Sequence, residues 1–252
     1  MINQETLLLV ILVFCRIGGC FLLLPGISSE RIPAQARLFF ALAISLAIAP
    51  LVMGQLQPVV KPNAETMLFY IVTETLVGML LGFFVRIFFL ALEFGAIAAA
   101  NFVGYGSVFT PSIEAAESTT PLAMIITLPA TALFFIMDMH ILILDLLQRS
   151  YTMFPPVQPF DFEPTMLALT ATLGTAFRLA MQVCAPLIVF SLSINLLLGF
   201  LNKMVPQIPA YYISMPFLLL GGLLVFYFLV GAILLNFQMS LSNHIMEFMG
   251  RG

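Results

Sequence analysis

Six long apolar runs dominate the sequence and leave few fold classes open. They cover residues 6–24, 38–53, 67–102, 122–147, 165–201 and 213–237. Because one membrane-spanning helix needs about 20 predominantly apolar residues, two or three of these runs exceed what one crossing requires. The sequence therefore predicts an all-α integral membrane protein with about six long, kinked helical units in a single domain, 1–252. In particular, Pro186 is expected to kink or split the helix of run 165–201.

The overall composition agrees with a membrane environment. The chain of 252 residues is 62% hydrophobic and 8% charged, whereas an average soluble domain has about 25% charged residues. Its net charge of −3 supplies no basic surface for phosphate backbones, so nucleic acid is excluded as a partner.

The orientation in the membrane does not follow from the sequence. The Lys and Arg residues in the loops divide three against three between the two sides of a six-span arrangement, and the chain has no Trp. Membrane proteins usually show a bias in loop charge and Trp at the interfaces. Both features favour helices that are surrounded by other protein more than by lipid.

No constellation of catalytic residues is found. The two histidines, His140 and His244, belong to no zinc-protease motif, and the chain has no nucleophile elbow, dinucleotide fingerprint or P-loop. The three cysteines lie inside apolar runs without metal-ligand spacing. We therefore expect no enzyme activity, no cofactor and no metal site.

Ionisable residues inside the apolar runs need partners, because an unpaired charge in a membrane costs at least about 2.5–3.5 kcal/mol. On an ideal helix Asp138 and Asp145 share one face, whereas His140 points nearly opposite to Asp138. These charges are interpreted as pairs at interfaces between helices or subunits, and a proton or ion relay is the alternative. The residues predicted to pair are Arg16, Glu74, Arg86, Glu93, Asp138, Asp145 and Arg178.

Small residues recur at four-residue spacing in the third apolar run. Gly78 and Gly82 are followed by Ala91, Gly95 and Ala99. Such a stripe lets another helix backbone approach closely, so this run is expected to pack tightly against neighbouring helices.

Three stretches together resemble the FliR family of flagellar type III export-gate proteins. They are "FCRIGGCFLLLPGISSERIPAQARLFFALAISLAIAP" (14–50), "DMHILILDLLQRSYTMFP" (138–155) and "LNKMVPQIPAYYISMPFLLLGG" (201–222). The shared features are the arginine in the first helix, the histidine helix followed by a Ser-aromatic pair, and the turn formed by Pro206 and Gln207. Two positions depart from the family pattern, Thr110 and Pro209.

The resemblance implies a non-enzymatic subunit of a helical gate that exports unfolded flagellar proteins. One copy of this chain would assemble with FliP and FliQ, with FlhB as a further partner, in the bacterial inner membrane at the flagellar basal body, projecting to the periplasmic side. Residues 1–164 would correspond to a FliP-like part and 165–252 to a FliQ-like helical hairpin. A related injectisome subunit is the alternative within the family, and a proton-coupled small-solute transporter that uses Asp138, Asp145 and Arg178 is the alternative outside it.

The resemblance also suggests a role for the polar stretch between the third and fourth runs. In the family, the segment equivalent to Gly104–Glu117 resembles a plug across the closed channel. Glycines permit unusual backbone angles there, and aromatic side chains can fill a narrow lumen; an ordinary surface loop is the alternative. The predicted plug residues are Gly104, Tyr105, Gly106, Ser107, Val108 and Phe109.

Overall fold

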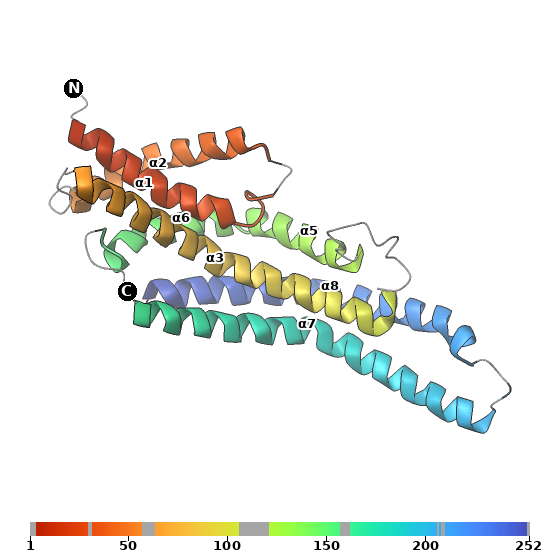
Figure 1. Cartoon of the computed structure of the whole chain (residues 1–252). Coiled ribbons are helices and arrows are strands. Elements are labelled where there is room, and N and C mark those ends of the chain that lie inside the picture. Colours follow the sequence, from red (N-terminus) through yellow and green to blue (C-terminus); the bar gives the residue numbers. More distant parts are fainter. Residues whose placement is uncertain are drawn as a thin grey trace. The chain divides into compact units, whose positions relative to one another are not determined.

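The computed structural model is all-α throughout the part of the chain that it describes, residues 4–29, 32–56, 64–105, 121–156, 162–205, 207 and 210–250. Seven helices are found within these ranges (Figure 1). They are α1 (Gln4–Leu23), α2 (Ala34–Leu56), α3 (Ala64–Val103), α5 (Pro121–Ile136), α6 (Met139–Met153), α7 (Phe162–Met204) and α8 (Ala210–Gly250).

Five of the described helices, α1, α2, α3, α7 and α8, are each long and apolar enough to cross a membrane. The pair α5–α6, bent by 66° at its break, passes the same test as a sixth, interrupted span. The prediction of an all-α membrane protein with about six long helical units is therefore confirmed.

Prolines inside the helices do not end them. Pro50 lies within α2, Pro129 within α5, Pro186 within α7 and Pro216 within α8. A proline removes one backbone hydrogen bond, but in apolar surroundings the remaining backbone groups have no partner except the helix itself. The run around Pro186 is thus a single helix of 43 residues. The sequence predicted either a kink or a split at Pro186, and the helix is not split.

The helix break between α5 and α6 corrects one expectation. Asp138 precedes α6 with φ 56° and ψ 23°, a left-handed conformation. Aspartate tolerates this region better than most residues because its short polar side chain adds little steric conflict. The single helical unit expected over the run 122–147 is therefore divided into α5 and α6. Asp138 is the N-cap of α6, and that it shares a face with Asp145 stays a prediction.

The chain divides into two compact units, each built from segments that are distant in sequence. The first comprises Met1–Ile87, Phe134–Thr172 and Leu241–Gly252, and the second comprises Phe88–Leu133 and Leu173–Ser240. The units therefore do not coincide with the division at residue 164. The division into a FliP-like part, 1–164, and a FliQ-like part, 165–252, describes similarity to other proteins, and it stays a prediction.

In the first unit, glycines bring the backbones of α1 and α3 into direct contact. A β-carbon at Gly78 would overlap the carbonyl oxygen of Arg16, and one at Gly82 would lie 2.5 Å from the carbonyl oxygen of Cys20. From the other side, a β-carbon at Gly19 would lie 2.5 Å from the carbonyl oxygen of Thr75. Side chains at these positions would push the two helices apart, so close packing is the use of the Gly78 and Gly82 part of the stripe.

In the second unit, the later part of α3 packs against α7 in the same way. A β-carbon at Gly95 would lie 2.7 Å from the carbonyl oxygen of Ala180 on α7. The rings of Phe89 on α3 and Phe237 on α8 meet edge to face at 4.9 Å. The Gln238 amide on α8 donates to the carbonyl oxygen of Ala130 on α5 at 3.0 Å. Apolar packing and side-chain bonds to backbone carbonyls thus join the four helical segments of this unit.

Candidate functional site

A buried ion pair occupies the centre of the first unit. The Nε and Nη2 atoms of Arg16 on α1 lie 2.6 and 2.8 Å from the two carboxylate oxygens of Glu74 on α3. Both side chains are only 1% exposed. This is the bidentate arrangement in which guanidinium and carboxylate bind each other most strongly.

The remaining contacts of Arg16 bring in α6. Its Nη1 donates to the Ser150 hydroxyl at 2.9 Å, and its Nη2 donates to the carbonyl oxygen of Phe154 at 2.9 Å. The guanidinium carbon also lies 3.9 Å from the centroid of the Tyr151 ring, within the range of a cation–π interaction. One arginine therefore joins α1, α3 and α6.

The local sequence explains how Arg16 reaches these partners. Glu74 and Gly78 are four residues apart, so they lie on the same face of α3. Gly78 allows the α1 backbone to touch α3 at Arg16, and the side chain then extends to Glu74 one turn away. The charge pair and the small-residue stripe are parts of one contact.

Ser150, Tyr151 and the Phe154 carbonyl were not identified as site residues from the sequence. The only signal was the Ser-aromatic pair within 138–155, which carried the family resemblance and no assigned role. A serine in an apolar segment is too common to indicate a ligand of a distant arginine. Pairing with Arg16 becomes visible only when α6 is placed against α1.

The other predicted charges have different surroundings. The Nη1 atom of Arg86 on α3 lies 3.4 Å from the Ser28 hydroxyl oxygen. Asp145 pairs with Arg149 one turn later on α6 at 3.1 Å, with both side chains about half exposed. Asp138 is exposed at the helix break. The structure therefore brings Arg16 and Glu74 together, but it does not place Asp138 and Asp145 at one shared partner.

Two further charges lie in the second unit. Glu93 is half-buried on α3, and Arg178 is exposed on α7, where its Nε lies 3.4 Å from the Gly174 carbonyl oxygen of the same helix. Neither takes part in a salt bridge among the described residues. Whether these two charges pair at interfaces with other subunits stays a prediction.

Neither histidine lies in a group of possible metal ligands within the described residues. His244 on α8 shares a 2.8 Å hydrogen bond with the Thr172 hydroxyl on α7. The ring of His140 lies 5.7 Å from that of Phe135. In the part of the chain that the structure describes, no group of three His, Cys, Asp or Glu residues is placed to hold a metal ion.

Of the predicted plug residues, the structure describes Gly104 and Tyr105. Gly104 has φ 93°, a conformation that glycine adopts without steric cost, and it follows the end of α3. The Tyr105 hydroxyl donates to the carbonyl oxygen of Leu219 on α8, and burial raises the pKa of this phenol, which keeps the donor protonated. Gly106, Ser107, Val108 and Phe109 lie outside the described residues, as does Pro206, while Gln207 is exposed in a turn.

The helices α7 and α8 present a large apolar surface. In the apolar spans of α7 and α8, 28% and 17% of the residues are buried, against 61% in that of α3. An apolar surface of this extent marks contact with lipid or with other protein. Large exposed side chains on these two helices include Phe177, Leu192, Leu196, Phe200, Phe217, Leu220, Tyr227 and Phe228.

The model of one protein family, described as bacterial export proteins, family 1, matches residues 7–244. The chain belongs to this family. It is similar to the flagellar biosynthetic protein FliR of Caulobacter vibrioides, with 29% identity over 214 residues that cover 84% of each chain. It is also similar to the FliR protein of Escherichia coli, with 29% identity over 79% of this chain and 75% of that protein.

A relative outside flagellar systems is similar over almost the whole chain. The secretion system apparatus protein SsaT of Salmonella typhimurium is 25% identical over 97% of this chain and 92% of its own length. The resemblance to the FliR family and its injectisome counterparts is therefore confirmed. The relatives of this export family are named as parts of secretion or flagellar assembly, and the apolar helices agree with a location in a membrane.

The buried pair allows a stability prediction with an internal control. Glu74→Gln keeps the side-chain shape but leaves the Arg16 charge buried without its counter-ion, so we expect a loss of about 3–5 kcal/mol in the free energy of unfolding. Asp145→Asn breaks the exposed pair with Arg149 and should cost less than about 1 kcal/mol. Denaturant titration of the two variants in mild detergent measures the difference. Equal losses would contradict a structural role for the Arg16–Glu74 pair.

Proposed function

We propose that this chain is a subunit of the flagellar type III export gate, which assembles with FliP-like and FliQ-like proteins to form and close a channel for unfolded flagellar proteins. The match of the export-family model to residues 7–244 is the observation that carries the proposal. Flagellar relatives at 29% identity favour the flagellar system. In this proposal the chain has no enzymatic activity of its own and acts in the bacterial inner membrane at the flagellar basal body.

The exposed apolar helices support assembly with other membrane subunits. An arginine in the middle of an apolar helix needs water or an acidic partner, and among the described residues the hydrogen-bond partner of Arg178 is a carbonyl oxygen of its own helix. In the assembled gate, helices of FliP-like and FliQ-like subunits would cover α7 and α8 and supply a group for Arg178. FlhB would be a further neighbour.

The segment that begins at Gly104 is proposed to close the channel. Gly104 has a positive φ at the end of α3, and Tyr105 holds the start of the segment to the Leu219 carbonyl on α8. This anchor would fix one end of the plug while the rest moves when a substrate passes. Since most helix connections need only about 2–8 residues, a polar stretch as long as 104–117 has length to spare for such a movement.

An injectisome subunit is the second candidate, because SsaT matches 97% of this chain. Both candidates assign the same chemistry to the chain, and they differ in the exported proteins. The transporter alternative has less support. Asp145 is already paired with Arg149 on the same helix, and Asp138 lies exposed at a helix break.

Affinity purification tests the proposed assembly. The tagged chain, extracted from its native membranes in mild detergent, is expected to carry FliP-like and FliQ-like proteins in a complex that mass spectrometry identifies. A deletion strain should lose motility and regain it with the tagged chain. A stable single chain without these partners would contradict the gate, whereas injectisome proteins in the complex together with unchanged motility would favour the second candidate.

Deletion of residues 106–115 tests the plug. The variant keeps Tyr105 and its bond to α8, so partners should still co-purify, while ions and small molecules should pass more readily through membranes that contain the complex. The Tyr105→Phe variant removes only the anchoring hydroxyl and should raise permeability less than the deletion. An assembled deletion complex with the permeability of the wild type would exclude a sealing role.

A further inference from the structure

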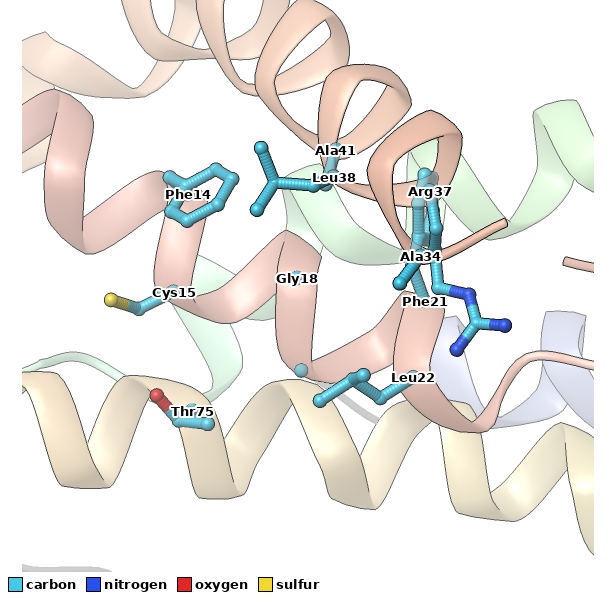
Figure 2. Close-up of a pocket in the computed structure, with 11 residues that line it drawn as sticks. Phe14, Cys15, Gly18, Phe21, Leu22, Ala34, Arg37, Leu38, Ala41 and Thr75 are labelled. Carbon is cyan, nitrogen blue, oxygen red and sulfur yellow. The ribbon is translucent and has the colours of Figure 1, made fainter. Parts of the chain in front are cut away.

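A groove in the first unit is lined mainly by α1 and α2, with Thr75 of α3 also in its lining. Its volume is about 380 Å³, and its lining includes Phe14, Gly18 and Leu22 from α1 and Leu38 and Ala41 from α2. Figure 2 shows these residues along the two helices, with Phe14 toward one end. The volume lies within the range of about 300–1,000 Å³ that is typical of small-ligand sites.

Gly18 leaves the middle of the groove open. A β-carbon at Gly18 would meet no heavy atom within 4 Å. The neighbouring Gly19, in contrast, is needed for the contact of α1 with Thr75 on α3. The two adjacent glycines therefore have different consequences, since Gly19 allows helix packing and Gly18 keeps a space free.

One cation lies at the end of this otherwise apolar groove. Figure 2 shows the Arg37 guanidinium near Leu22, away from Phe14. Its Nη2 donates to the Ser29 carbonyl oxygen at 3.2 Å, while its buried Nε has no hydrogen-bond partner within the described part of the chain. A guanidinium at the end of an apolar groove favours an anionic acceptor, and the planar arginine fork is suited to phosphate.

The position of Arg37 along the helices indicates where such an anion lies. Arg37 is in the first turn of α2, whose apolar span covers Ala34–Gly54, and the apolar span of α1 ends at Leu23. Both apolar spans therefore end at this end of the groove, where a membrane-spanning hairpin meets the headgroup region. A basic site between membrane helices at the headgroup level is the arrangement that recognises anionic lipids.

We propose that this groove binds one anionic phospholipid, with its phosphate on Arg37 and an acyl chain along Gly18 toward Phe14. The apolar lining accepts methylene groups, and the Arg37 guanidinium at the end of the groove supplies a charge-assisted hydrogen bond to a phosphate oxygen. An apolar stretch that ends at a cation matches an acyl chain with a phosphate at its end, and contact with a helix of a partner protein is the outcome that crosslinking at Leu38 would reveal. The inference requires only a membrane location and does not depend on the export gate.

Photolabelling provides a direct test. The full chain, together with the proteins that co-purify with it, is reconstituted into lipid discs that contain phosphatidylglycerol with a photoactivatable group in its acyl chain. We expect labelled peptides from 14–22 and 34–41. Diacylglycerol with the same photoactivatable acyl chain has no phosphate and should label them about tenfold less, as loss of a hydrogen bond to a charged group implies. Added inorganic phosphate should not compete, because it has no acyl chain to fill the groove.

Matched variants identify the site. Gly18→Leu should fill the groove and reduce labelling at least about fivefold, whereas Gly54→Leu, at another open glycine on α2 outside the groove, should not. Arg37→Gln should reduce labelling by phosphatidylglycerol, while Arg149→Gln removes an equal charge elsewhere without this effect. Thermal unfolding in detergent checks that each variant is folded. If Gly18→Leu is not folded, Ala34→Leu is a second variant that fills the groove, because Ala34 also lines it.

Three results would overturn the proposal. Equal labelling by both lipids would exclude recognition of the phosphate by Arg37. Unchanged labelling in a folded Gly18→Leu or Ala34→Leu variant would place the lipid elsewhere. A photo-crosslinking amino acid at Leu38 that couples to another protein and not to lipid would show that a partner helix covers the groove.

Discussion

The buried pair of Arg16 and Glu74 is the interaction on which the first unit depends. An arginine inside an apolar helix bundle is tolerated only when its charge and its N–H groups are satisfied. Here the Glu74 carboxylate, the Ser150 hydroxyl and the Phe154 carbonyl oxygen accept four hydrogen bonds from Arg16. Because these groups belong to α3, to α6 and to Phe154 directly after α6, burial of the arginine requires that three helices take up one arrangement.

Close backbone contact and the ion pair support each other. Gly78 permits the approach of α1 to α3, and this approach places the guanidinium beside Glu74. The pair in turn specifies which part of α1 faces α3, which apolar side chains alone would leave less well defined. In the second unit, the Tyr105 and Gln238 bonds to backbone carbonyls of α8 and α5 have the same effect without a buried charge. Such contacts leave the outer faces of α7 and α8 for lipid or partner subunits.

The sequence predicted most of the helices well because in a long apolar run the backbone groups have no partner except the helix itself. The stripe around Gly78 predicted close packing for a similar local reason. The bend at Asp138 was missed, since an isolated left-handed residue interrupts an apolar run without a proline or glycine to indicate it. The partners of Arg16 were also missed in part. Glu74 is 58 residues from Arg16 and Ser150 is 134 residues away, so only the packing of the helices brings them together.

Paired replacement of Arg16 and Glu74 measures most directly whether this buried pair is structural. In the native bacterium with its own copy deleted, the account predicts that Arg16→Met alone and Glu74→Gln alone reduce both complex assembly and motility. The double variant Arg16→Met with Glu74→Met removes both charges, since apolar residues of similar volume often replace a buried pair with little loss of stability. It should therefore recover assembly and most of the motility. A double variant that assembles fully but remains non-motile would contradict the account, because it would show that the charges themselves act in export.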